Sequence, residues 1–516
     1  MAARPIDIDA LTLDAVLSGA LDGRPVTVLG LARSGIALAR FLHDAGARVT
    51  AYDGRDAAAL EGAIAQLGDR AIDLRLGPDV DPATTWADAA LVTTSPSITP
   101  DYPTTEPRLR AQLQALVAAR AAGDVTAPAL VSESDLFLRL CPAPTIGVTG
   151  TKGKTTTASL AHAILSASPA HPAILGGNIG TPLVERLPEL TPEHRVVVEL
   201  SELQLPALSR GTTVAVYTNV TSDHLDRHGS MAAYRRVKRR LAELVDPDGA
   251  LVLNLEDPVV GGYAGLGTAP VVLYRNDNPT PGGLGVVDGW IVNAAVERLP
   301  LAGGGISAAG PGGGIMPVAE LGVPGAHNVS NALAAIAVGL LFGVAPDAIR
   351  RAAAGFTGVE HRLQSVGLIG HVRFVNDSNG TQPDAVIAAL RAFPAPVVLI
   401  AGGRDKGIDL GELARVVGAT AYAAVLIGES GPTLEGLFRD AGLARTARAT
   451  SMDDAVAFAA RLADEALMDL PEGTFATVVL SPAAASFDMF EDYAARGRAF
   501  IDAVGRVARA SGEAPA

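Results

Sequence analysis

The chain has 516 residues, of which 48% are hydrophobic, with 56 glycines and 34 prolines, and this length predicts two to four domains. Its net charge of -14 argues against a nucleic-acid or anionic-membrane partner, because either would need a basic face. A single cysteine, Cys141, excludes an intramolecular disulfide framework and fits a reducing compartment. We find no signal-peptide pattern, and the longest apolar run, Ala332 to Ala345, is too short to cross a bilayer, so we expect a cytoplasmic protein without membrane insertion.

The first segment, "PVTVLGLARSGIALARFLHDAGARVTAYD", predicts a strand, a helix and a second strand that ends at Asp53. Gly30 and Gly35 bracket the first turn, but Ala32 stands where a dinucleotide-binding motif has its middle glycine. The turn therefore fits either a Rossmann-like packing turn without a ligand or a site for a nucleotide diphosphate, with Asp53 facing the base or ribose. A later strand runs into the loop Ser95-Pro96-Ser97, which we expect at the same edge of the sheet.

The stretch "GVTGTKGKTTT", Gly147 to Thr157, predicts a phosphate-binding loop between a strand and a helix that begins at Lys154. The usual loop needs a glycine at position 148, where this chain has Val148. We expect the backbone N–H groups from Gly150 to Thr155 to point at a phosphate, Lys154 to neutralise it and the Thr155 hydroxyl to hold Mg²⁺. The alternative is a glycine-rich turn without a ligand.

Polar residues follow the next two predicted strands. A buried strand ends at Glu199, and the loop after "VAVYTNV" carries His224 and His228. Glu199 and His224 beside a phosphate loop suit a second metal site, whereas His228 fits an ordinary loop histidine. Lys238 lies in "YRRVKRRL", a pattern that by itself indicates a solvated helix face.

The last third repeats the doubly wound α/β pattern, with strands in "VRFVNDS", "PVVLIAGGRDKG", "AAVLIG" and "ATVVLSP" and polar loops after them. Before it, residues 280–317 predict loops and short strands, and a helix begins at about Asn328. Residues 108–124 predict an extra helix to which the pattern assigns no function.

Nine motifs together resemble the Mur ligases, in the order found in that family and over nearly the whole chain: "GVTGTKGKTTT", "GGNIG", "ELSELQL", "NVTSDHLDRHG", "YRRVK", "GAHNVSNALAA", "EHR", "NDS" and "SPAAASFDMFEDYAARG". The family's phosphate loop is G-x-x-G-T-x-G-K-[ST], so Val148 belongs to it. The resemblance implies an α/β protein of three domains. These are a UDP-sugar-binding Rossmann-like domain at residues 1–141, a central P-loop ATPase domain at 142–359 and a Rossmann-like, glutamate-binding domain at 360–516.

Within the family the chain looks most like the glutamate-adding members. That resemblance implies a monomeric, ADP-forming ligase that adds D-glutamate to UDP-N-acetylmuramoyl-L-alanine, in cytoplasmic peptidoglycan precursor synthesis. The substrate carboxylate would attack ATP to form an acyl phosphate, which the amine of glutamate then attacks. Two Mg²⁺ ions would offset the repulsion between the carboxylate and the triphosphate.

The resemblance also implies residue roles. Lys154, Lys238 and His224 are the expected catalytic residues, with Lys238 carbamylated, and the expected metal ligands are Thr155, Glu199, His224 and Lys238. The expected ATP contacts are Gly150, Thr151, Lys152, Gly153, Lys154, Thr155, Thr156, Asn328, Asn331, Arg362 and Asp377. The expected substrate contacts are Arg33, Ser34, Asp53, Ser95 and Ser97 for the uridine diphosphate, Asn178, Ser201 and Gln204 for the muramoyl part, and Thr381, Lys406, Ser486 and Tyr493 for glutamate.

Three departures from the family pattern bear on the substrate. Asn379 stands where many D-glutamate enzymes have a lysine, Tyr493 replaces a phenylalanine, and the diphosphate loop reads Ser-Pro-Ser instead of Ser-Pro-Gly. A related branch that adds L-glutamate also lacks the lysine, so this activity is the first alternative. The others are a family member for a different amino acid and a nucleotide-binding module without catalysis.

Overall fold

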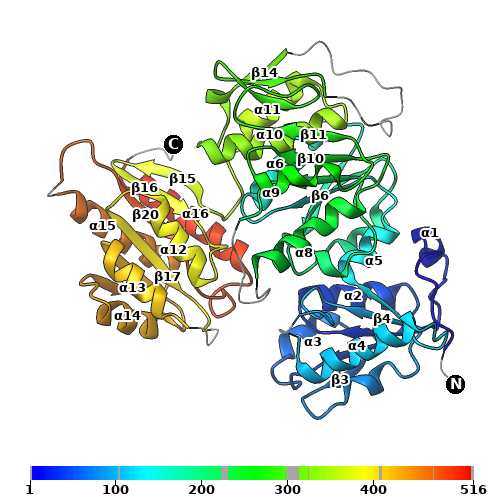
Figure 1. Cartoon of the computed structure of the whole chain (residues 1–516). Helices are drawn as coiled ribbons and strands as arrows, with labels where there is room; N and C mark the ends of the chain where they lie inside the picture. Colours follow the sequence, from blue (N-terminus) through cyan, green and yellow to red (C-terminus); the bar gives the residue numbers. More distant parts are fainter. Residues whose placement is uncertain are drawn as a thin grey trace. The chain divides into compact units, whose positions relative to one another are not determined.

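The computed structural model of the chain describes residues 3–102, 105–221, 230–296, 299, 313–323, 325–405, 409–468 and 470–512 (Figure 1). The chain folds into two compact units, Met1–Phe356 and Thr357–Ala516. The first unit holds two sheets and the second holds one, which confirms the expected α/β class. The domain boundaries expected at residues 141 and 359 stay predictions.

The first sheet is parallel, with strand order β3-β2-β1-β4-β5. Its strands are β1 (Pro25–Leu29), β2 (Arg48–Asp53), β3 (Asp73–Leu76), β4 (Leu91–Thr94) and β5 (Ala129–Ser132). Its helices are α1 (Leu13–Leu17), α2 (Arg33–Asp44), α3 (Glu61–Leu67), η1 (Pro82–Thr85), α4 (Pro107–Ala121) and α5 (Glu133–Leu140). The strand order reverses between β1 and β4, so the loops after these two strands flank the crevice where open α/β sheets bind ligands.

The second sheet has the order β14-β13-β12-β11-β10-β9-β6-β8-β7. Its strands are β6 (Thr145–Thr149), β7 (Ala173–Gly177), β8 (Arg195–Glu199), β9 (Val214–Tyr217), β10 (Ala250–Asn254), β11 (Val271–Tyr274), β12 (Leu284–Val287), β13 (Trp290–Asn293) and β14 (Gly313–Pro317). Its helical segments are α6 (Lys154–Ser166), η2 (Leu183–Glu189), η3 (Leu205–Ala207), α8 (Met231–Leu244), α9 (Pro258–Gly261), η4 (Gly262–Gly265), η6 (Val318–Glu320), α10 (Ala326–Leu341) and α11 (Pro346–Gly355).

Helices α6 and α10 pack on one face of this sheet over a core of Ile, Val, Leu and Ala side chains. A Cβ atom at Gly339 of α10 would press on Ile164 of α6, so the glycine permits the close approach of the two helices. The apolar run that we expected to form a buried helix, Ala332 to Ala345, is buried in α10 up to Leu341, and its last four residues lie beyond the helix. Among the residues described, no helix is long and apolar enough to cross a membrane.

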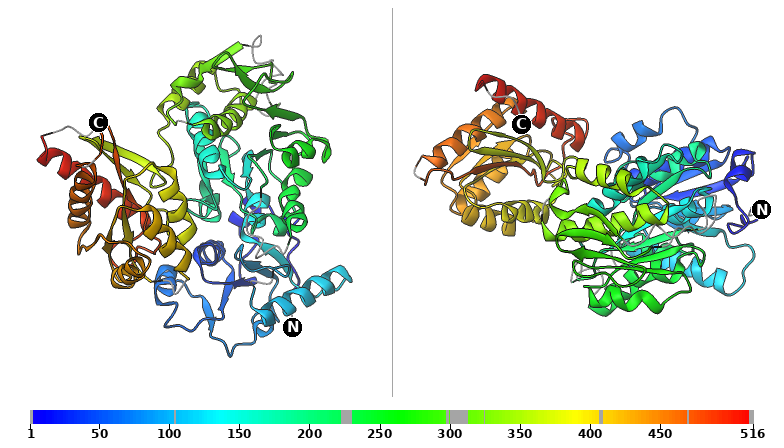
Figure 2. Two further views of the ribbon diagram at one scale, coloured as in Figure 1. Left: turned by 60° about the vertical axis from the view of Figure 1, so that its left-hand side comes forward. Right: turned by 90° about the horizontal axis from the view of Figure 1, so that it is seen from above.

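The third sheet, in the second unit, has the order β15-β16-β20-β17-β18-β19, and only β15 runs antiparallel to its neighbour. Its strands are β15 (Gln364–Ile369), β16 (Val372–Asn376), β17 (Val397–Gly402), β18 (Ala423–Ile427), β19 (Thr446–Arg448) and β20 (Ala476–Leu480). Helices α15 (Met452–Leu467) and α16 (Tyr493–Ala510) cover one of its faces, and α12 (Pro383–Ala392), α13 (Gly411–Thr420) and α14 (Gly431–Asp440) cover the other (Figure 2). A separate apolar core lies beneath each group of helices.

Gly35 controls how closely the start of α2 approaches the turn after β1. A Cβ atom at this position would overlap the carbonyl oxygen of Gly30, which itself adopts a φ of 88°. We therefore expect Gly35→Ala to destabilise the first sheet by about 1–3 kcal/mol. The measurement is denaturant unfolding followed by the fluorescence of Trp86, which is buried against this sheet.

Gly62→Ala is the matched control, because it adds the same methyl group to α3, a helix that packs with the same sheet. No atom lies within 4 Å of a Cβ placed at Gly62. It should stabilise its helix by up to about 1 kcal/mol. Equal stability of the two variants would contradict the close approach at Gly35.

Candidate active site

The phosphate loop needs glycine at each of its three glycine positions for a separate steric reason. In β6, a Cβ atom at Gly147 would press on Thr212, and beyond the strand one at Gly150 would overlap Thr218. Gly153 has a left-handed φ of 81°, and a Cβ atom there would overlap the side chain of Asn331. Val148 is a buried residue of β6 and takes no part in the turn. The loop is therefore pressed between the end of β9 and the start of α10.

Thr218 and Asn219 hold this loop from the neighbouring strand β9. Asn219 accepts hydrogen bonds from the N–H groups of Thr151 and Lys152, at 2.7 and 2.9 Å, and the Thr218 hydroxyl donates to the Lys152 carbonyl at 2.6 Å. The expectation that every N–H from Gly150 to Thr155 points at a phosphate is thus wrong for Thr151 and Lys152. Sequence reasoning missed both supporting residues, although the "TN" that follows an apolar run was the available signal.

Lys154 and Asn331 lie on this loop. The Lys154 ammonium donates to the carbonyl oxygens of Gly150 and Thr151 at 3.0 and 2.9 Å. The Asn331 side chain accepts from the Thr157 hydroxyl at 3.3 Å and donates to Asn328 at 3.2 Å. Thr155 is buried in the first turn of α6, and Thr156 follows it. The structure thus gathers the expected ATP residues of the first unit around one helix N-terminus.

Glu199, at the end of β8, has an unusual carboxylate. It is 1% exposed, and its Oε1 accepts a hydrogen bond from the Asn178 side chain at 3.0 Å. Its Oε2 is buried and has no hydrogen-bond partner in the described part of the chain. A buried, unpaired carboxylate oxygen is costly, and a bound cation would satisfy it. Glu199 therefore fits the expected role of a magnesium ligand.

Lys238 is completely buried, so a solvated helix face is the wrong interpretation of its position. It shares the inner face of α8 with Tyr234, and its ammonium lies 5.5 Å from the centre of the Tyr234 ring. The same ammonium donates to the Gly150 carbonyl at 2.9 Å and to the Thr149 hydroxyl at 3.3 Å. The structure therefore places Lys238 directly beneath the phosphate loop.

Two expected site residues, His224 and Lys406, lie outside the described residues. In the ranges that the structure does describe, no three His, Cys, Asp or Glu side chains gather into a metal-binding cluster.

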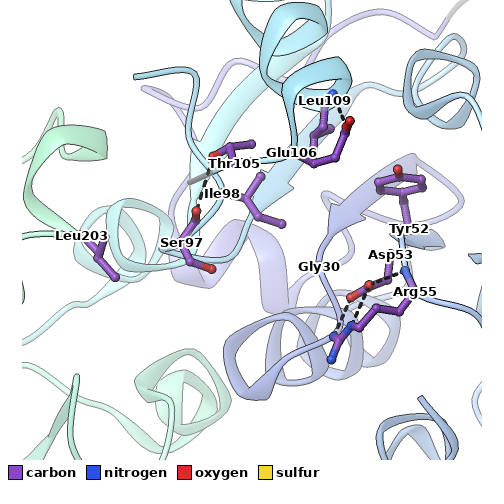
Figure 3. A pocket seen from close by; sticks show the side chains of 11 residues that line it. Gly30, Tyr52, Asp53, Arg55, Ser97, Ile98, Thr105, Glu106, Leu109 and Leu203 are labelled. Atoms are coloured by element: carbon purple, nitrogen blue, oxygen red, sulfur yellow. Dashed lines mark hydrogen bonds and ion pairs between the residues drawn. The ribbon is translucent and has the colours of Figure 1, made fainter. Parts of the chain in front are cut away.

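A cavity of ≈ 440 Å³ opens at the switch point of the first sheet (Figure 3). Its lining includes Gly30 after β1, Asp53 at the end of β2, Arg55 just beyond it and Ser97 after β4. The beginning of α4 supplies Glu106 and Leu109 to the opposite wall. This helix is the one to which the sequence pattern assigned no function, and the structure makes it a wall of the cavity.

Asp53 and Arg55 form an ion pair in the lining of that cavity. Arg55 donates to both carboxylate oxygens of Asp53, at 3.0 and 2.9 Å, and the Leu31 N–H donates to one of them at 2.9 Å. Burial opposes ionisation of Asp53, but these hydrogen bonds outweigh it and lower its pKa. Asp53 is therefore an anion whose oxygens are already partnered, and Arg55, which sequence reasoning missed, lies beside it in the cavity wall.

Among the remaining expected nucleotide-sugar residues, Arg33 and Gln204 form hydrogen bonds that connect the segments of the first two sheets. Arg33 opens α2 and donates to the Asn178 carbonyl at 3.2 Å. Gln204 accepts hydrogen bonds from the Ser201 N–H and hydroxyl at 2.9 and 3.0 Å and donates to Ser134 of α5 at 2.9 Å. Ser95 is buried and donates to the Gly30 carbonyl at 3.3 Å. Ser34 is the half-buried second residue of α2.

In the second unit, Asp377 follows β16 and joins two loops. It is 4% exposed, and it accepts hydrogen bonds from the Ser481 hydroxyl at 2.6 Å and from the Leu363 N–H at 3.1 Å. Burial raises its pKa to about 6, although these hydrogen bonds and the charge of Arg362 oppose the shift. Arg362 itself is exposed.

Thr381, Ser486 and Tyr493 lie on the loops after β16 and β20 and at the start of α16. Ser486 is buried, while Thr381 and Tyr493 are half-buried. The two loops are joined by the Ala483 N–H, which donates to the Gly380 carbonyl at 2.9 Å. Three of the four expected glutamate residues are thus brought to one edge of the third sheet.

The phosphate loop, the Glu199 carboxylate, one of whose oxygens has no partner among the described residues, and the three α/β sheets define a nucleotide-binding α/β protein. Residues 148–339 match the Mur ligase middle domain, and residues 361–480 match the Mur ligase glutamate ligase domain. Two similar curated proteins are UDP-N-acetylmuramoylalanine–D-glutamate ligases. The one from Symbiobacterium thermophilum is 37% identical over 475 residues, covering 92% of this chain and 96% of that protein. The one from Geobacter metallireducens is 36% identical over 500 residues, covering 96% and 100%.

Among solved structures, MurF from Acinetobacter baumannii matches with a TM-score of 0.49 and 17% identity, covering 89% of this chain and 91% of that one. The chain belongs to the Mur ligase family, because two Mur ligase domains match most of it and the curated ligases match it over more than 90% of its length.

The raised pKa of Asp377 predicts a pH-dependent stability of the second unit. A carboxyl whose folded pKa exceeds its ordinary value of about 3.9 binds protons more strongly in the native state, so its contribution to stability is lost as the pH rises through this window. Between pH 4 and pH 7.5, wild-type protein should therefore lose about 2 kcal/mol of unfolding free energy relative to Asp377→Asn.

The measurement is denaturant unfolding of both proteins across this pH range. Asp440→Asn, which removes an exposed carboxylate at the end of α14 in the same unit, controls for the loss of a charge. If the stability difference between wild type and Asp377→Asn did not change with pH, Asp377 would not be titrating as its burial requires.

Proposed function

We propose that the chain is an ATP-dependent, ADP-forming ligase that adds D-glutamate to UDP-N-acetylmuramoyl-L-alanine in cytoplasmic peptidoglycan precursor synthesis. The observation that carries this proposal is the similarity over more than 90% of the chain to ligases of that name. The phosphate loop, with Lys154 and Asn331 packed on it, supports ATP as the phosphoryl donor. A substrate carboxylate is a poor acyl donor, and transfer of the γ-phosphoryl group to it supplies a leaving group for the attack of the glutamate amine.

In this proposal the protein binds and orients two anions that repel each other. The N–H groups at the start of α6 and the Lys154 ammonium hold the phosphates of ATP. Glu199, Thr155, the carbamylated Lys238 and His224 would hold two Mg²⁺ ions. When bound, the ions supply positive charge that offsets the repulsion between carboxylate and triphosphate. Asn328 and Asn331 lie on the adenine side, and Arg362 and Asp377 contribute from the second unit.

The uridine diphosphate would occupy the cavity beside Asp53 and Ser97, with Arg33 and Ser34 on its diphosphate. Asn178, Ser201 and Gln204 would bind or position the muramoyl part. Support comes from the place of the cavity at the switch point of a parallel sheet, next to the N-terminus of α2. Thr381, Lys406, Ser486 and Tyr493 would bind glutamate. We further propose that the enzyme acts as a monomer.

The ligation of L-glutamate is the second candidate, and Asn379 is the residue that favours it. The deciding experiment supplies ATP, UDP-N-acetylmuramoyl-L-alanine and both glutamate enantiomers at equal concentration, followed by chiral analysis of the product. We expect only D-glutamate in the product, because a site that anchors both carboxylates places the amine of the mirror image elsewhere. Product that contains only L-glutamate would establish the alternative, and no product with either enantiomer would reject both.

Lys154→Ala should lower kcat/KM by roughly a hundredfold or more while the fold is kept, because the variant loses the charge that faces the transferred phosphoryl group. Phosphate release during ligation measures this loss, and circular dichroism checks the fold. Arg350→Ala, which removes a cation from an exposed ion pair with Glu320, is the control and should retain activity. Near-normal turnover by folded Lys154→Ala would reject the proposed ATP site.

Only four of the chain's basic residues are lysines, Lys152, Lys154, Lys238 and Lys406, and all are expected site residues. Arginine cannot replace the amine of Lys238 if that amine carries a carbamate. We expect Lys238→Ala to be nearly inactive and to be partly rescued by acetate or formate, which supply the lost anion. Lys238→Arg should be inactive and not rescued. An active Lys238→Arg variant would show that a positive charge at this position is sufficient for activity, and it would reject the carbamate.

A further inference from the structure

Arg496, in the first turn of α16, is completely buried. Among the described residues it is the largest whose side chain is fully buried. Its Nε donates to the Ser378 hydroxyl at 3.0 Å, and its Nη2 donates to the Ser378 carbonyl at 3.0 Å. Both terminal nitrogens donate to the Ala484 carbonyl, at 3.2 and 3.3 Å. All these acceptors are neutral, and no carboxylate of the described ranges forms an ion pair with it.

A buried charge without a counterion is expensive, and proteins usually avoid it. Burial lowers the pKa of Arg496 to about 10, so the guanidinium is still charged at neutral pH. The negative charge of Asp488 acts on Arg496 from a distance and opposes the lowering of its pKa. The Asp488 carboxylate itself accepts a hydrogen bond from the Glu429 N–H at 2.8 Å. The loops around Arg496 therefore lie beside a positive charge that, within the described residues, has no hydrogen-bonded counterion and is offset only from a distance by Asp488.

The same guanidinium fixes the loops of the proposed amino-acid site. Ser378 precedes Thr381 by three residues, and Ala484 precedes Ser486 by two. The Ser378 hydroxyl, which accepts from Arg496, also donates to the Tyr493 carbonyl at 2.7 Å. One side chain thus connects the three segments that carry Thr381, Ser486 and Tyr493.

We propose that Arg496 is a positioning residue that also sets substrate specificity: it holds these segments in place, and its unneutralised charge favours an amino acid with a second carboxylate over the corresponding amide. This proposal rests on the proposed function, because it concerns the same amino-acid site. The charge of Arg496 would also supply a cation near a site where Asn379 stands in place of the family's lysine. The guanidinium is fully covered and its hydrogen bonds go to protein oxygens, so it acts through the loops and through its charge, not by touching the substrate.

The test compares kcat/KM for glutamate and for glutamine, using the enantiomer that the wild-type enzyme accepts. Arg496→Met removes the charge and should raise the KM for glutamate at least about tenfold and lower the glutamate-to-glutamine ratio of kcat/KM by about tenfold. Arg496→Lys and Ser378→Ala keep a buried charge but weaken the loop contacts, so both should raise the KM while the ratio stays within about threefold of wild type. The KM for the nucleotide sugar should not change in any variant.

Arg506→Met is the matched control, because Arg506 lies on the same helix in an exposed ion pair with Asp453. It should leave both KM and the ratio unchanged. A folded Arg496→Met variant that keeps the wild-type ratio overturns the inference. If that variant does not fold, a collapse of the ratio in Ser378→Ala or Arg496→Lys overturns it instead, and retention of the ratio in both supports it. A wild-type enzyme that uses neither glutamate enantiomer overturns the proposed function, and this inference with it.

Discussion

The close packing of the phosphate loop between β9 and α10 is the constraint on which the rest of the site depends. Because Gly150 and Gly153 have no side chains, Thr218 and Asn331 can lie directly against the loop backbone. A Cβ atom at either glycine would overlap the residue that lies against it. That approach lets Asn219 hold the loop from one side and lets Lys238 reach the Gly150 carbonyl from below. The glycine spacing is therefore a packing requirement of this sheet as well as a phosphate-binding pattern.

At its carboxyl edge, each of the three sheets carries a carboxylate that accepts a hydrogen bond from another residue at the same edge. Asp53 is held by Arg55, Glu199 by Asn178, and Asp377 by Ser481. The three carboxylates nevertheless differ in their surroundings. The carboxylate of Asp53 is fully partnered, one oxygen of Glu199 is left for a cation, and the pKa of Asp377 is raised by burial. The three carboxylates are thus in three different electrostatic environments, and a different role is proposed for each.

The strands were predictable because buried parallel strands are short, β-branched and apolar, as in β1, β6 and β17. The phosphate loop was predictable from its local spacing. Contacts between distant residues were not, because no short pattern encodes them: Gln204 meets Ser134 across 70 residues, and Arg496 meets Ser378 across 118. For the same reason Lys238 was expected, from its basic neighbours alone, on a solvated surface, whereas the helix buries that side chain.

The central claim is that the chain activates a carboxylate by phosphorylation. The most direct measurement uses UDP-N-acetylmuramoyl-L-alanine labelled with ¹⁸O in its terminal carboxylate, with ATP and D-glutamate, and mass analysis of the inorganic phosphate that is released. An acyl-phosphate intermediate transfers one carboxylate oxygen to phosphate, so the account predicts one ¹⁸O atom in each phosphate formed. Ligation that releases unlabelled phosphate would contradict it.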